Sequence, residues 1–553
     1  MRLQKRYKHF HRYREITQTL TKHGFGFLIR QLGLSEFLRG RRPGVKNELD
    51  RKYNAESIRL VLEELGTTFI KLGQILSTRP DLIPEEITKE LTKLQDQVPP
   101  FSFLEVRKQI ENELGSALED LFKSFEAQPL AAASIGQVHR AEMLDGKKVV
   151  VKVQRPGIEE NIRIDLEIML DIARLIEKHT DWSQFYNFTE AVLEFEDILL
   201  NEMDYLVEGQ NIDVFQKNFK DVEDVCIPKV HWDYTTRRIL TMEYIEGIKL
   251  DDVHALSEQG IDTVKVANVL SKAVFKQILY DGFFHGDPHP GNILVIDNNR
   301  IALLDFGIIG MIDDEMKEKF GDLLISQVNK NTEAVMRTFM NLGITPPNIN
   351  RRELRQDIER MRYKYYDRPL SKIKLGDTMK EFMDLAFKYR ILLPAEFTLM
   401  GKTFMILEGQ ITRLAPEISL MEIAEPFGRE LVKERWSFGY FRKTLSKNVH
   451  NYGQIFSAFP KQIADLLDVL ERGQFKATLE HEYNEKMLNR LNHMVNRLAF
   501  SIVLASLIVG LSFLIQITEQ SIIWKLPIAE IGFIVAGAMG FWLLISIIRS
   551  GRF

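Results

Sequence analysis

The sequence has very little cysteine and no large excess of either charge. Cys226 is its single cysteine among 553 residues, which excludes an intrachain disulfide framework and a cysteine-based zinc site. The 73 basic and 77 acidic residues leave a net charge of −4, so overall electrostatics give no reason to expect a nucleic-acid partner. A hydrophobic content of 45% is typical of a folded protein, and the length is enough for two or more compact units.

The N-terminal region lacks the apolar run of a secretory signal peptide, so we expect the main body to remain in the cytoplasm. Its first stretch, "MRLQKRYKHFHRYRE", mixes basic and aromatic side chains, with no acidic residue before Glu15. Such a basic N-terminal arm, residues 1–50, predicts contact with an anionic lipid membrane, because each basic residue near the surface contributes about 1 kcal/mol. A solvated tail, or one that touches nucleic acid, is the alternative.

Long apolar runs occur only near the C-terminus. Residues 498–517 and 531–548 predict a two-helix transmembrane hairpin over residues 498–550, after an amphipathic helical connector at residues 431–497. Arginines flank the pair on both outer sides, whereas the loop between the runs has one lysine, so both ends should face the cytoplasm of a cell membrane. Small residues at every fourth position of the second run would allow close helix packing, including a homodimer. A hydrophobic hairpin buried in a soluble domain is the alternative.

Residues 51–128 have the periodicity of helices. The stretch "ESIRLVLEELGTTFIKLGQILSTRPDLIPEEITKELTKLQDQ" predicts two helices, because the prolines of "STRPDLIP" end the first and start the second. Gly66 and Gly73 lie seven residues apart on the first helix and would leave one side open to close approach. We therefore expect a helical extension that packs tightly against another element.

The periodicity changes from helix to strand near residue 129. "KKVVVKV" and its flanks predict a β-rich unit with a hairpin turn at Asp145 and Gly146. Two long helical stretches and two further strands follow before residue 249, and residues 250–430 are mainly helical. This order predicts an α+β fold with a strand-rich lobe at residues 129–249, a helical lobe at residues 250–430 and a site between them.

The segment "FFHGDPHPGNILV" combines several residue types that can carry chemistry. His285, His289 and Asp287 suggest a metal site, but two prolines and two glycines prevent the helix that would hold both histidines on one face. A turn without chemistry is another reading, since Asp among Gly and Pro usually forms turns. However, Asp287 is followed by Asn292 and then by Asp305 of "LLDFG" at the spacing of the catalytic and metal-binding residues of protein kinases.

Phosphoryl transfer needs these residue types. Asn292 and Asp305 could hold Mg²⁺ beside the triphosphate of ATP, and Asp287 could orient or deprotonate the attacking hydroxyl or water. The same chemistry needs a strand lysine for the phosphates, and Lys152 in "VVVKVQRP" fits unless it faces solvent. The helical acids that could pair with this lysine are Glu202, Asp204 and Glu208.

Six stretches occur in order across about residues 50–430: "KLGQ", "AAASIGQV", "VKVQRPG", "EMDYLVEGQN", "FHGDPHPGN" and "DFG". Together they resemble the UbiB (AarF/ADCK) family of atypical protein-kinase-like ATPases. The resemblance implies a two-lobed protein-kinase-like fold with the helical extension in front of it. It also implies ATP and Mg²⁺ as cofactors and a role in isoprenoid quinone biosynthesis or lipid handling, with quinone-biosynthesis enzymes or quinone precursors as partners.

The resemblance further implies roles for single residues. Lys152 would contact the nucleotide, with Glu208 as its partner. An extension carrying Lys71 and Gln74 would fold over the active site, and the polar counterparts of these two residues would be Glu202 and Asp204. The other ATP-binding positions would be Ala132, Ala133 and Ser134, in place of a glycine-rich loop, and Glu243.

The stretch after "DFG" departs from an ordinary protein kinase. A helix is predicted almost at once, with no long activation segment and no A-P-E motif, so phosphorylation of protein substrates in trans is not expected. The sequence thus predicts a membrane-anchored, Mg²⁺-dependent ATPase or atypical kinase. One alternative is a small-molecule phosphotransferase similar to aminoglycoside or choline kinases, which share the H-G-D loop. The other is a pseudokinase that senses ATP or lipid without turnover.

Overall fold

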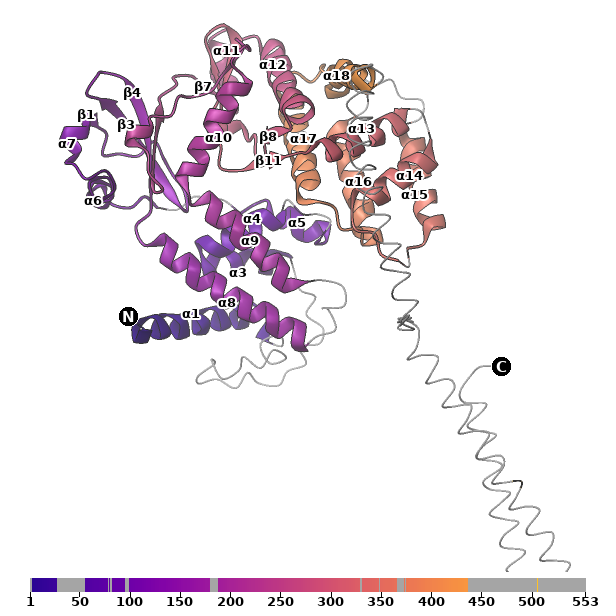
Figure 1. Cartoon of the computed structure of the whole chain (residues 1–553), viewed down its shortest axis with the longest axis horizontal. Coiled ribbons are helices and arrows are strands. Elements are labelled where there is room, and N and C mark those ends of the chain that lie inside the picture. Colours follow the sequence, from indigo (N-terminus) through magenta and orange to yellow (C-terminus); the bar gives the residue numbers. More distant parts are fainter. Residues whose placement is uncertain are drawn as a thin grey trace, which may run out of the picture. The chain divides into compact units, whose positions relative to one another are not determined.

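The computed structural model describes residues 2–26, 55–77, 79, 82–94, 99–179, 187–328, 331–347, 349–365, 372, 374–435 and 505 (Figure 1). Residues 1–442 form one compact unit, which holds every described residue except residue 505. The hairpin predicted at 498–550, apart from residue 505, and most of the connector predicted at 431–497 lie outside the described residues. Within the described part, no helix is long and apolar enough to cross a membrane, so the hairpin stays a prediction.

An antiparallel sheet forms the base of the strand-rich lobe. Its strands, in the order β1-β3-β4-β6 with β2 paired to β3, are β1 Phe122–Phe125, β2 Ala131–Ala132, β3 Gly136–Met143, β4 Lys148–Gln154 and β6 Ile239–Glu243. Val149, Val151 and Val153 alternate along β4 and are fully buried in one cluster with α6, Phe103–Leu114. Lys152 therefore faces the opposite side of the sheet. The lobe begins before the predicted residue 129, because α6 and β1 are part of it.

Helix α10, Tyr205–Asn218, packs on that opposite side of the sheet. Ile212 and Phe215 of α10 belong to the same buried cluster as Leu240 of β6. Two longer helices, α8 Ile158–His179 and α9 Phe188–Glu202, connect the sheet to α10 and pack against each other. The predicted extension packs against these two helices (Figure 1).

The extension consists of α3 Ala55–Leu65, α4 Thr67–Ser77 and α5 Glu85–Leu91. The first helix predicted from the sequence is broken at Gly66, whose φ of 87° is a left-handed conformation that glycine adopts without strain. Gly73 fulfils the predicted close approach, because a Cβ at this position would overlap the side chains of Leu62 and Leu94. Helix α4 contacts both α8 and α9, so the "KLGQ" sequence lies against the strand-rich lobe.

The first part of the predicted N-terminal arm is a docked helix and not a solvated tail. Helix α1, Arg2–Lys22, packs on α3 and α8 (Figure 1). The Arg12 guanidinium donates to both carboxylate oxygens of Asp165 at 2.7 and 3.0 Å, and to the Leu65 carbonyl at 2.6 Å. Thr68 donates to the same carboxylate at 2.6 Å, so Asp165 links α1 to the start of α4. Residues 27–54 of the arm lie outside the described residues.

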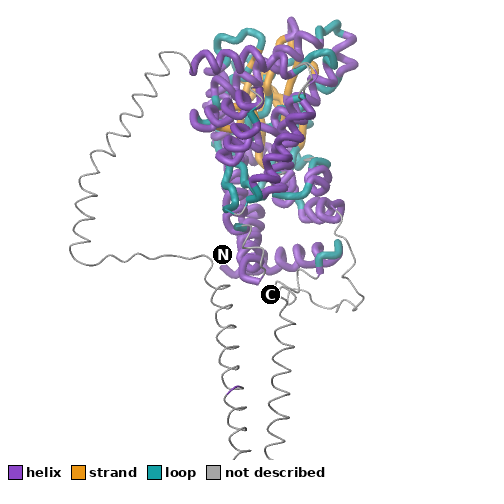
Figure 2. Tube along the Cα trace, turned by 90° about the vertical axis from the view of Figure 1, so that its right-hand side faces the viewer, coloured by secondary structure: helices purple, strands orange, loops and turns teal. Residues whose placement is uncertain are grey.

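The helical lobe contains eight described α-helices and several short strands (Figure 2). The helices are α11 Val253–Glu258, α12 Thr263–Phe275, α13 Asp314–Val328, α14 Thr332–Leu342, α15 Arg351–Tyr365, α16 Leu375–Tyr389, α17 Ala395–Leu414 and α18 Leu420–Arg435. Helix α17 runs through the core, where Phe397, Met400 and Phe404 are fully buried. It packs against α12 and α16.

Two small sheets flank the loops that contain Asp287, Asn292 and Asp305. One has the order β5-β10-β9-β7, and the other pairs β11 with β8. Their strands are β5 Val225–Cys226, β7 Ile248–Lys249, β8 Phe283–His285, β9 Ile293–Ile296, β10 Arg300–Leu303 and β11 Ile309–Met311. The mixed α+β architecture predicted from the sequence is thereby confirmed.

Replacing Asp165 tests the link between α1 and the extension. Asp165→Ala removes the buried counter-ion of Arg12, which keeps the more exposed Glu15 at 2.8 Å, and the free energy of unfolding should fall by roughly 3 kcal/mol. Urea denaturation followed by circular dichroism measures this change. Lys8→Ala is the control, because Lys8 and Glu160 pair at 2.8 Å with exposed side chains and such pairs contribute less than about 1 kcal/mol. Equal losses in both variants would contradict a special role for Asp165.

Candidate active site

The ion pair between Lys152 and Glu208 joins the sheet to α10. Lys152 Nζ donates to the two carboxylate oxygens of Glu208 at 2.9 and 2.8 Å. Lys152 lies on the α10 side of β4, and Glu208 lies in the first turn of α10, with 4% of its surface exposed. Of the three acids that the sequence left open as partners of this lysine, the structure selects Glu208.

The pKa values at this pair follow from burial and from neighbouring charges. Burial alone would lower the pKa of Lys152, but Glu208 and Asp305 outweigh it and hold that pKa well above its usual value. Burial raises the pKa of Glu208, while Lys152 opposes this rise. Burial also disfavours ionised Asp305, yet Lys152 and more weakly Lys71 hold the pKa of Asp305 below its usual range. Lys152 therefore remains a cation that favours ionised Asp305.

The loop after β8 is shaped by its first histidine. His285 is 2% exposed, and its Nδ1 accepts a hydrogen bond from the backbone N–H of Asp287 at 3.1 Å. Burial lowers the pKa of His285, which suits this acceptor role. The His289 N–H in turn donates to the Asp287 carbonyl at 2.6 Å. The two histidines therefore hold the backbone around Asp287. In the described part of the chain, no cluster of three His, Cys, Asp or Glu residues is placed to hold a metal ion.

Asn292 and Asp305 are brought together by a hairpin. Strands β9 and β10 pair antiparallel with Ile293 opposite Leu303, and the Leu304 N–H donates to the Asn292 carbonyl at 3.0 Å. Asn292 and Asp305 therefore leave the same end of the hairpin. Their side-chain oxygens are the donor type that Mg²⁺ prefers, so these residues could hold this metal.

Helix α10 also fixes the segment that contains Asp305. The Asn211 side chain donates to the Phe306 carbonyl at 3.0 Å, and the Phe306 ring lies 5.0 Å from that of Phe215, between centroids. Phe306 is fully buried, so this segment has little freedom to turn away. As a result, Asp305 Oδ1 lies 3.8 Å from Lys152 Nζ. Asn211 and Phe215 were not predicted as site residues, although Asn211 lies within the "EMDYLVEGQN" stretch.

The loop predicted to cover a nucleotide runs from β2 to β3. Ala132 ends β2, and Ala133 donates to the Gly136 carbonyl at 2.8 Å. Ser134 is fully buried, and its hydroxyl has no hydrogen-bond partner among the described residues. Glu243 lies at the end of β6, where its carboxylate accepts from the Lys229 N–H at 3.3 Å. A nucleotide contact by each of these residues stays a prediction.

The extension reaches the site through Lys71, which donates to the carboxylate of Glu202 at the end of α9. Lys71 is 9% exposed, so this ion pair is largely shielded from water. Gln74 donates to the Leu94 carbonyl at 3.5 Å, within the extension itself.

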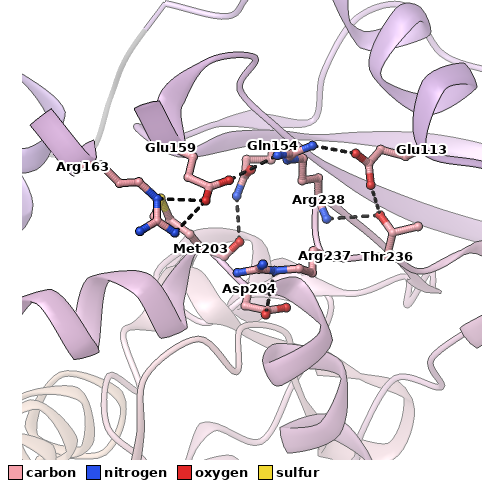
Figure 3. Close-up of polar contacts among 9 residues, drawn as sticks. All are labelled: Glu113, Gln154, Glu159, Arg163, Met203, Asp204, Thr236, Arg237 and Arg238. Carbon is pink, nitrogen blue, oxygen red and sulfur yellow. Dashed lines mark hydrogen bonds and ion pairs between the residues drawn. The ribbon is translucent and has the colours of Figure 1, made fainter. Parts of the chain in front are cut away.

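Asp204 does not take the predicted place beside the extension. Its carboxylate pairs with Arg237 at 3.0 Å and caps α10 by accepting from the Leu206 N–H at 3.1 Å (Figure 3). The backbone between the two acids is held by Gln154, which donates to the Met203 carbonyl at 2.7 Å (Figure 3). Because the chain turns between α9 and α10, acids two residues apart point to different cations.

Helix α17 contacts the loop around Asp287, and the sequence analysis did not predict this contact. Gln410 donates to the Pro288 carbonyl, and the Thr403 hydroxyl lies 3.4 Å from the Gly286 carbonyl oxygen. Lys402 Nζ lies 3.3 Å from Asp287 Oδ1. These contacts join segments that are 122 residues apart for Gln410 and Pro288, so no local pattern could predict them.

Comparison with protein families gives three matches along the chain. The ABC1 atypical kinase-like domain matches residues 93–339, which hold Lys152, Glu208, Asp287 and Asp305. The UbiB helical domain matches residues 358–419. The ABC1/UbiB kinase-like C-terminal domain matches residues 484–549, which apart from residue 505 lie outside the described residues.

Similar curated proteins come from bacteria and a plant. The "Uncharacterized protein in hydrogenase 1 5'region" of Clostridium pasteurianum is 35% identical over 98% of this chain and 99% of its own. "Protein ACTIVITY OF BC1 COMPLEX KINASE 8, chloroplastic" of Arabidopsis thaliana is 32% identical over 99% of this chain and 77% of its own. "Probable protein kinase UbiB" of Xylella fastidiosa is 34% identical over 74% of this chain and 75% of its own.

Two neutral substitutions should separate the roles of the neighbouring acids. Glu202→Gln removes a counter-ion of Lys71 that holds α4 against α9, so amide hydrogen exchange in α4 should rise by about tenfold, whereas Asp204→Asn should leave α4 unchanged. Asparagine still caps a helix, which makes Asp204→Asn a matched control. Exchange is followed by mass spectrometry of peptides from α4. Faster exchange after both substitutions, or after neither, would contradict the assigned pairing.

Proposed function

Because this chain belongs to the ABC1/UbiB family of atypical kinase-like proteins, as its sequence motifs predicted, we propose that it is a Mg²⁺-dependent ATPase or atypical kinase. The observation that carries the proposal is the placement of Asp305, 3.8 Å from a lysine that is itself held by buried Glu208. A charged lysine and an oxygen-donor pair beside it are what a metal-bound triphosphate requires.

The donor set fits Mg²⁺ and a nucleotide. Asn292 and Asp305 would bind the metal through oxygen atoms. The buried hydroxyl of Ser134 has no hydrogen-bond partner among the described residues, so it could form a hydrogen bond with the nucleotide. Mg²⁺, when bound, would neutralise charge on the phosphates. Lys152 would bind the α- and β-phosphates.

Asp287 would act on the acceptor. Its carboxylate would orient a water or hydroxyl and take its proton as the acceptor oxygen bonds to the γ-phosphorus and the bond to the bridging oxygen breaks. The leaving group is ADP. Water is the favoured acceptor, because β11 leads almost directly into α13 and provides no shelf for a peptide.

Asp305→Asn tests the ATPase proposal. Full-length protein in detergent or liposomes should release phosphate from ATP only with Mg²⁺, and Asp305→Asn should lower kcat by about 100-fold or more, because a neutral amide is a poorer metal ligand. Asp297→Asn is the control, with the same charge change on an exposed turn. Phosphate release is measured by a coupled assay.

Other outcomes of the same experiment identify the alternatives. Tight nucleotide binding without turnover in the wild-type protein would favour a pseudokinase. Phosphate that appears on an added hydroxylated small molecule, and not as free phosphate, would favour a phosphotransferase.

The proposal includes attachment to an anionic cell membrane. The apolar runs of the sequence support it, as does the outer face of α1, where Tyr7 is 72% and Phe10 is 53% exposed. His11 and Arg14 are exposed at helical spacing from these aromatics, so basic and aromatic groups share one face. A role in isoprenoid quinone biosynthesis rests on the family resemblance alone, and the quinone profile of a deletion strain tests it.

Vesicle binding tests the α1 face without the apolar runs. In a chain that ends at Arg442, the end of the compact unit, Tyr7→Ser with Phe10→Ser should weaken binding to anionic vesicles by about tenfold or more, because both aromatics lose their apolar contact. Leu104→Ser is the control, since Leu104 is 78% exposed on α6. Flotation of vesicles with and without anionic lipid measures the binding. Equal binding of all three chains would refute lipid contact by α1.

A further inference from the structure

Asp287 has a cationic partner that its own loop does not supply. The stretch "FFHGDPHPGNILVIDNN" contains no lysine or arginine. The cation beside Asp287 is Lys402 of α17, whose Nζ lies 3.3 Å from Asp287 Oδ1. Both side chains are partly shielded, with 22% of Lys402 and 34% of Asp287 exposed.

Helix α17, which holds this lysine, packs against the loop of Asp287. Thr403 next to it is fully buried and lies 3.4 Å from the Gly286 carbonyl oxygen. Gln410, two turns further along, is 7% exposed and donates to the Pro288 carbonyl. The helix therefore holds the backbone on both sides of Asp287, and Lys402 extends from the same helix to its carboxylate.

The charge of Lys402 addresses a difficulty of the proposed reaction. A carboxylate that takes a proton from the acceptor must approach a triphosphate that is also negative, and two anions at short distance repel each other. A cation beside Oδ1 of the Asp287 carboxylate reduces this repulsion. It also fixes the rotation of the side chain and leaves Oδ2 for the acceptor.

We propose that Lys402 is a positioning residue for Asp287, which it orients toward the acceptor from α17. This inference rests on the proposed ATPase or kinase function. It differs from the role of Lys152, which lies on the nucleotide side of the site and pairs with Glu208. Lys402 therefore affects the rate of phosphoryl transfer and not the affinity for nucleotide.

Substitution of Lys402 in the full-length protein tests the inference. Lys402→Met should lower kcat for Mg²⁺-dependent ATP hydrolysis by about 10- to 100-fold, while the Kd for Mg-ATP from fluorescence titration changes by less than about twofold. Lys402→Arg should stay within about threefold of the wild-type kcat, because it retains the charge. In the Asp287→Asn background, Lys402→Met should change kcat by less than about twofold, since the group it positions is gone.

Arg413→Met is the matched control. Arg413 lies on the same helix and donates to the Asp251 carbonyl at 3.0 Å, away from Asp287. Thermal unfolding of each variant checks the fold. Wild-type kcat in Lys402→Met, or an equal loss in Arg413→Met, overturns the inference while the ATPase proposal stands. Absence of turnover in the wild-type protein instead refutes the proposed function and the inference together.

Discussion

The need of Lys152 for a counter-ion constrains the rest of the site. Its strand neighbours Val151 and Val153 are fully buried on one side of the sheet. On that side the charge of the lysine would be surrounded by apolar side chains, which is unfavourable. Glu208 meets this need from the first turn of α10, which sets the position of the helix on the sheet. One turn later, Asn211 holds the backbone of Phe306. A single ion pair thus places a strand, a helix and the segment with Asp305 in one arrangement.

Three acids of the site each have a cation from a different element, whereas Asp305 shares Lys152 with Glu208. Glu208 pairs with a lysine of β4, Glu202 with one of α4, and Asp287 with one of α17. Most of the negative charge of these acids is therefore compensated before any phosphate arrives. A triphosphate would have to share Lys152 with Glu208 and Asp305, so its binding is coupled to the position of α10 and of the segment with Asp305. The contact of Lys152 with Asp305 joins the two lobes, and the pair of Lys71 with Glu202 joins the extension to the strand-rich lobe.

Local patterns predicted part of this arrangement well. The α+β architecture follows from periodicity and turn chemistry. The strand lysine was expected from the kinase-like spacing of Asp287, Asn292 and Asp305, and Lys152 fits because it lies within a β-branched strand. The break at Gly66 was missed because a glycine within a helical pattern is compatible with continuation, and only packing decides. Asp204 was wrongly expected beside the extension, because the turn between α9 and α10 separates its side chain from that of Glu202. Lys402 could not be found at all, since tertiary packing alone brings α17 to the loop.

Helix α6 also determines where the chain can be divided. It covers the three buried valines of β4, and its Ser102 and Glu105 close a capping box at the start of the helix. A fragment that began at residue 129 would expose those valines to water and leave residues 141–143 of β3, which pair with β1, as a bare edge that invites aggregation. Phe101 is bonded to Gln137 through its backbone N–H at 3.2 Å. The smallest fragment that keeps the candidate site and suits expression and crystallisation therefore begins before this phenylalanine.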